Sequence, residues 1–228
     1  MKKIVSTLLA SLLAFVTISA MAQFGGLGGL LGGAAKGGAD SGGDIDSQVR
    51  GFVQQSNDIN GLLYVSLKTI TAAYESDEEA AKIAAEVKAF NASTDPKERA
   101  AKVAEAQKTD GAKLAELAKS ADAQEKTKSL TKEKQQRIVI SVSNFLVAGL
   151  KAMTLAKSGQ SLVQSVAANP MSIGKVLPVK DALRILASAA STSVDVIPGF
   201  IKVLQGANLT VSKVDANTKT QEVDDWGK

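Results

Sequence analysis

A run without a single charged side chain lies between Arg137 and Lys151, and most of its residues are apolar. A helix that is apolar around most of its circumference is normally enclosed by other elements. Membrane insertion is the rival interpretation, but the 13 residues 138–150 fall short of the roughly 20 that a spanning helix needs. The run therefore predicts a buried core helix, which we expect over residues 129–157.

Amphipathic helices are predicted before this core helix. Apolar residues recur at three- and four-residue intervals over 45–74, and acidic residues at 77–79 are typical of the start of a second helix. Asp95-Pro96 supplies a cap and a proline at the first helical position. A third helix is therefore expected from there to about Ser120, with an interruption at Asp110-Gly111 left open.

The distribution of charges and of helix-breaking residues predicts the rest of the fold. Residues 75–137 contain 13 acidic and 13 basic side chains, a mixture typical of a solvated helical hairpin. After Gly159, short helices divided by prolines are expected at 160–168, 178–196 and 198–204, and no segment shows convincing strand alternation. The predicted fold class is all-α: a bundle of four to five main helices with a protruding charged helical hairpin, preceded by a Gly-rich flexible segment.

The first 22 residues show the order of segments found in a secretory signal peptide. Lys2 and Lys3 precede an uncharged apolar run, and Ala20-Met21-Ala22 places small residues before a cut at Gln23. The sequence therefore predicts export to the periplasm, with extracellular or envelope-associated residence as alternatives. The predicted division is a signal peptide at 1–22, a Gly-rich linker at 23–43, a helical domain at 44–206 and a polar flexible tail at 207–228.

The Gly-rich segment after the predicted cut allows two interpretations. Glycine loses much backbone entropy on folding and offers no side chain to bury, which favours a flexible tether. Glycines spaced four residues apart, with bulky residues between them, would instead permit close helix packing in a membrane. The side chains that would make a weak membrane or partner contact are Phe24, Leu27, Leu30 and Leu31.

Composition restricts the chemistry that the chain can perform. It contains no histidine and no cysteine, so Ser–His–Asp and Cys–His catalysis, His-ligated zinc and disulfides are excluded. Removal of the predicted signal leaves 206 residues with 25 basic and 23 acidic side chains, a balance that speaks against nucleic-acid binding. No catalytic residue, cofactor site or metal site is assigned, and a non-enzymatic protein is predicted.

Three polar residues within apolar helical patterns are candidate buried groups. They are Asp58 and Asn60 in the first predicted helix and Asn144 in the core helix. A buried polar group without a partner costs about 1–3 kcal/mol, so each should be hydrogen-bonded or face water. Hydrogen bonds that fix the register between helices are the preferred role, and a ligand pocket is the alternative.

Three functions fit the sequence. The first is an exported helical binding or assembly protein that acts through helix faces on an unidentified protein partner, without catalysis. The second is a membrane-active helical protein that inserts the Gly/Leu segment or the apolar core helix. The third is an enzyme or small-ligand carrier that uses carboxylates or lysines. We place them in that order.

Overall fold

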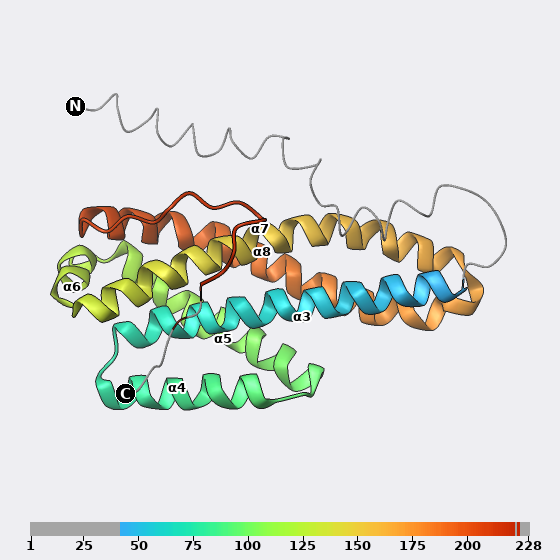
Figure 1. Cartoon of the computed structure of the whole chain (residues 1–228), viewed down its shortest axis with the longest axis horizontal. Coiled ribbons are helices and arrows are strands. Elements are labelled where there is room, and N and C mark those ends of the chain that lie inside the picture. Colours follow the sequence, from blue (N-terminus) through green and yellow to red (C-terminus); the bar gives the residue numbers. More distant parts are fainter. Residues whose placement is uncertain (1–41, 222, 224–228) are drawn as a thin grey trace, which may run out of the picture. The chain divides into compact units, whose positions relative to one another are not determined.

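The regular structure of the chain is helical in the residues that the structure, a computed structural model, describes, which are 42–221 and 223. The predicted all-α bundle is therefore confirmed (Figure 1). The elements in chain order are α3 (Gly42–Ala73), α4 (Asp77–Ala92), α5 (Pro96–Lys119), α6 (Ala123–Ser129), α7 (Lys132–Ala168), the 3-10 helix η3 (Pro170–Lys175) and α8 (Val176–Gly206).

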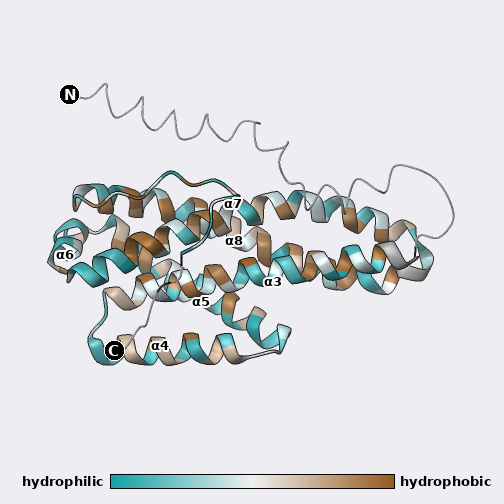
Figure 2. Ribbon diagram, in the orientation of Figure 1, coloured by the Kyte–Doolittle hydropathy of each residue, from teal (hydrophilic) through white to brown (hydrophobic). Residues whose placement is uncertain are grey.

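The apolar run forms the middle of α7 and lies in the core. Ile138, Val142 and Phe145 are fully buried where α7 packs against α3 and α8. Figure 2 shows the corresponding hydrophobic bands along α7 and α8. Among the described helices, α7 alone is long and apolar enough to cross a membrane, but 56% of its most apolar window is buried inside the bundle. The prediction of a buried core helix is thus confirmed.

The last two long helices are more continuous than the sequence predicted. The expected breaks at Gly159 and Pro198 both fall inside helices, in α7 and α8. Pro198 removes one intrahelical hydrogen bond, at a cost of about 3 kcal/mol. Its neighbours Ile197 and Phe200 are buried in the core, and their burial offsets that loss.

The charged segment forms a helical hairpin from α4 and α5. The predicted starts are confirmed: the Ser76 hydroxyl accepts from the Glu79 amide at 3.3 Å, and the Asp95 carboxylate accepts from the Lys97 amide at 2.9 Å. The outer arm, α4, packs mainly against α3, whereas the inner arm, α5, packs between α3 and α8 (Figure 1). No interruption occurs at Asp110-Gly111, since α5 is continuous.

Glycines permit close approach at two helix crossings. A Cβ added at Gly149 of α7 would lie 2.6 Å from Ser193 Oγ and 2.8 Å from Ser193 Cβ of α8. A Cβ at Gly159 would lie 2.5 Å from the Phe52 ring and 2.7 Å from Leu183 Cδ2. Gly51 of α3, by contrast, has no such neighbour within 4 Å. The distance between α7 and α8 therefore depends on a missing side chain at Gly149.

We expect Gly149→Ala to lower the free energy of unfolding by about 1–3 kcal/mol, because overpacking must displace α7 from α8. Gly51→Ala is the matched control and should raise it by about 0.5–1 kcal/mol through helix propensity alone. Urea denaturation followed by circular dichroism measures both. Equal effects of the two substitutions would show that the close crossing is not a constraint.

Candidate functional site

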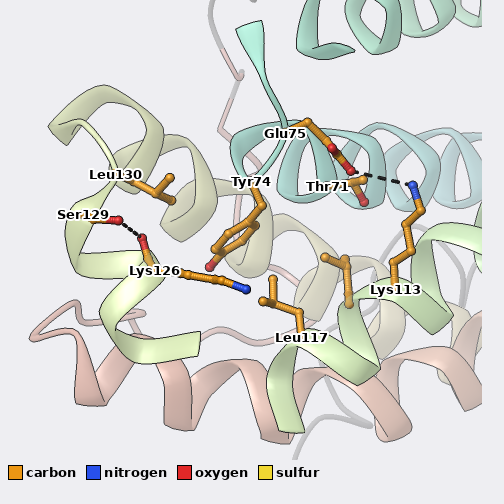
Figure 3. Close-up of a pocket in the computed structure, with 9 residues that line it drawn as sticks. Thr71, Tyr74, Glu75, Lys113, Leu117, Lys126, Ser129 and Leu130 are labelled. Atoms are coloured by element: carbon orange, nitrogen blue, oxygen red, sulfur yellow. Dashed lines mark hydrogen bonds and ion pairs between the residues drawn. The ribbon is translucent and has the colours of Figure 1, made fainter. Parts of the chain in front are cut away.

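A cavity of about 400 Å³ opens at one end of the bundle, between α3, α5 and α6 (Figure 3). This volume is within the range of small-ligand sites. The turn after α3 contributes Tyr74 and Glu75, and Leu130 follows α6. The complete lining is Thr71, Tyr74, Glu75, Lys113, Leu114, Leu117, Lys126, Ser129 and Leu130.

Tyr74 fixes α6 against the end of α3. Its hydroxyl lies 2.8 Å from Thr127 Oγ1, and its ring meets Phe200 of α8 edge-on, with centroids 6.1 Å apart. The side-chain amide of Gln135, from α7, donates to the carbonyls of Thr127 and Lys128 at 3.0 and 3.1 Å. Those carbonyls belong to the last turn of α6, where the Thr127 carbonyl has only a long main-chain bond of 3.4 Å from the Leu130 amide. The cavity wall is therefore held from three other helices.

Asn144 forms a second candidate site, in contact with the irregular segment that follows α8. Its side chain is only 4% exposed on α7. Asn144 Nδ2 donates to the main-chain carbonyl of Gln221 at 2.7 Å, and the Gln221 amide donates to Asn144 Oδ1 at 3.0 Å. One carboxamide thus satisfies both main-chain groups of one residue. Its predicted burial is confirmed, but its partner is the segment after α8 and not another helix.

The other two predicted polar residues have different surroundings. Asn60 is buried, as expected, but its amide donates within α3 to Ser56 at 3.4 Å, and its Oδ1 has no hydrogen-bond partner in the structure. Asp58 is exposed, so the prediction that it is buried was wrong. The neighbouring Ile59 and Leu63 face the core, and this turns Asp58 to the solvent side of the helix. None of the three residues lines the cavity.

A partly buried ion cluster between α3, α4 and α5 was not predicted. Lys68 Nζ lies 2.8 Å from Glu86 Oε2 and 3.1 Å from Asp110 Oδ2, and Asp110 is only 4% exposed. Lys68 also lies 5.9 Å from the centroid of the Tyr64 ring. No sequence pattern indicates this cluster, because Asp110 lies in a segment whose mixed charges are typical of a solvated surface. The cluster joins three helices, which is a structural role.

The remaining candidate contacts lie outside the described residues. They are Phe24, Leu27, Leu30 and Leu31 of the Gly-rich segment. Within the described residues, no group of three or more His, Cys, Asp or Glu side chains could hold a metal ion. The cavity lining also escaped prediction, since it combines ordinary residues from three helices that no sequence motif links.

No protein-family model, curated protein or solved structure matches the chain. Functional inference therefore rests on the cavity and on the contact between Asn144 and Gln221.

We expect stability to fall as the pH rises above about 10. Burial raises the pKa of Tyr64 and of Tyr74 above 10.0, against an opposing charge from Lys68 and a hydrogen bond from Thr127, respectively. Burial lowers the pKa of Lys68, but hydrogen bonds and charges from Glu86 and Asp110 outweigh it and raise that pKa above 10.5. The folded chain thus holds these protons more tightly than the unfolded chain, so unfolding becomes easier in alkali.

The measurement is the urea concentration at the midpoint of unfolding, at about pH 8 and about pH 11. Tyr74→Phe removes one of the titrating groups and should reduce the difference between the two midpoints. A midpoint unchanged between the two pH values would contradict this expectation.

We also expect Asn144→Ala to release the segment after α8, because the Gln221 main chain loses both hydrogen bonds. Limited trypsin digestion should then cut faster after the exposed Lys213 and Lys219, as read by mass spectrometry. Gln164→Ala, at an exposed position of the same helix, is the control and should leave cleavage unchanged. Equal cleavage in both variants would show that Asn144 does not retain the segment.

Proposed function

We propose that the chain is an exported, non-catalytic helical binding protein that acts on a protein partner through the face of α7 around Asn144. The observation that carries the proposal is the paired hydrogen bonding of the Asn144 carboxamide with the Gln221 main chain. An extended polypeptide is the kind of ligand that such a pair of contacts recognises.

Asn144 binds the main chain of Gln221 and not its side chain. The Gln221 side chain is exposed, and both hydrogen bonds involve groups that every residue except proline carries. An extended segment of a partner could therefore form the same two bonds in place of Gln221. The segment after α8 then acts as an internal competitor for the partner.

Export and the absence of catalysis rest on the sequence. The segment order at 1–22 supports export to the periplasm, with envelope association or release as alternatives. The lack of histidine and cysteine removes the commonest catalytic bases, thiol nucleophiles and transition-metal ligands. Binding is the function that remains compatible with the residue types and with the α7 contact.

The membrane-active alternative rests on α7 itself, whose length and apolar composition would suit a membrane span. Its burial among α3 and α8 opposes that alternative, because the bundle would have to open before α7 could meet lipid. The Gly/Leu segment at Phe24–Leu31 offers a weaker, peripheral contact.

The test is photo-cross-linking in intact cells, with a photoreactive amino acid replacing Ser143 beside Asn144. We expect an adduct with an envelope protein that weakens in Asn144→Ala and strengthens when residues 207–228 are deleted, since deletion removes the competitor. Lys88 of α4, exposed and on another helix, is the control position.

An adduct that neither Asn144→Ala nor the deletion changes would overturn the proposal. Adducts with lipid in place of protein would support the membrane-active alternative instead. The protein level of each variant is compared by immunoblot, so a folding defect is distinguished from loss of binding.

A further inference from the structure

We propose that the cavity between α3, α5 and α6 binds a small amphiphile with an anionic head group and an alkyl chain, as in a medium-chain fatty acid. The inference concerns a different part of the molecule from the Asn144 contact and does not rest on it. The volume of about 400 Å³ is sufficient for a ligand of this class.

The inner wall of the cavity suits an alkyl chain. Of the three leucines in the lining, Leu114 is buried, and Leu117 and Leu130 are half-buried. Tyr74 contributes its ring, because its hydroxyl already pairs with Thr127 at 2.8 Å. Apolar atoms of a ligand would cover these side chains and displace water from them.

Two ammonium groups suit an anionic head at the mouth. Lys113 and Lys126 both line the cavity, with side chains 65% and 56% exposed. Figure 3 shows Lys126 extending from α6 into the space between the helices, and Lys113 extending from α5 to Glu75 on the opposite side. The opposing charge in the lining is Glu75, whose carboxylate lies 3.7 Å from Lys113 Nζ. An ammonium group forms a stronger hydrogen bond with a carboxylate than with a neutral hydroxyl, which favours an acid over an alcohol.

Each lysine keeps hydrogen-bonding capacity for a ligand. Lys126 Nζ lies 3.0 Å from Asp122 Oδ2, outside the lining, but an ammonium group has three donors. The pair of Lys113 with Glu75 is long for a charge-assisted hydrogen bond. A carboxylate at the mouth could therefore accept from either lysine without breaking the framework of the bundle.

Thr71 is a buried polar residue of the cavity wall. It is 3% exposed, and its hydroxyl has no hydrogen-bond partner in the structure. Because the oxygen itself has almost no accessible surface, a ligand in the cavity would not contact it, and the lysines supply the polar contacts of the head group. Figure 3 places Thr71 on the same side of the cavity as Glu75 and Lys113.

The experiment is isothermal titration calorimetry of the full mature chain with decanoate, beside decan-1-ol. We expect decanoate to bind and the alcohol to bind more weakly. Joint replacement of Lys113→Gln and Lys126→Gln should weaken decanoate binding about threefold to tenfold. Lys119→Gln on the same helix as Lys113, with an exposed side chain outside the lining, is the matched control and should bind like the unaltered chain.

A decanoate that carries a diazirine locates the site on the same protein. Cross-links in the peptides that contain Tyr74, Leu117 or Leu130 would support the cavity, and cross-links confined to other helices would overturn it. Equal affinity for acid and alcohol, or equal weakening by Lys119→Gln, would overturn the anionic head group. Thermal unfolding of each variant without ligand distinguishes loss of fold from loss of binding. The photo-cross-linking at Ser143 tests a different part of the molecule, so failure of one proposal does not decide the other.

Discussion

The burial of α7 is the constraint on which the rest of the bundle depends. Its central turns offer no charge to solvent, so other helices must cover them, and α3 and α8 do so along most of its length. The close crossing at Gly149 and Ser193 brings α8 near enough to exclude water. With these three helices in place, α5 packs against α3 and α8, and α4 is left at the outside.

Both candidate sites arise where the packing of these helices leaves a polar group without a helical partner or a space unfilled. Asn144 lies in the uncharged, largely apolar middle of α7, so its carboxamide needs partners that the neighbouring apolar side chains cannot provide. The main chain of Gln221 provides them. At the end of α3, the short α6 does not fill the space beside α5, and a cavity remains whose lining includes three leucines and two lysines.

The sequence was a good guide wherever a local pattern decided the structure. The acidic residues at 77–79 and the Asp95 cap marked helix starts, and the uncharged run marked the core. The predictions failed where contacts between residues distant in sequence determine the structure. No local pattern reveals that Phe52 and Leu183 meet at Gly159, inside a helix that continues through this position. The candidate sites follow the same division: the burial of Asn144 was predictable, whereas its partner 77 positions along the chain and the cavity lining were not.

The attachment of α4 implies that the bundle does not open as one cooperative unit. Only Ile83, Val87 and Phe90 of this helix are buried, and they pack chiefly on α3. A helix with so few buried contacts separates at a lower free energy than the core helices and forms its own unit of local unfolding. When it separates, the stacked pair of Phe90 and Tyr64 is broken, and Lys68 loses Glu86 but keeps Asp110. The buried acid on α5 therefore keeps its counter-ion in the partly open state, so the inner bundle can persist after α4 has left.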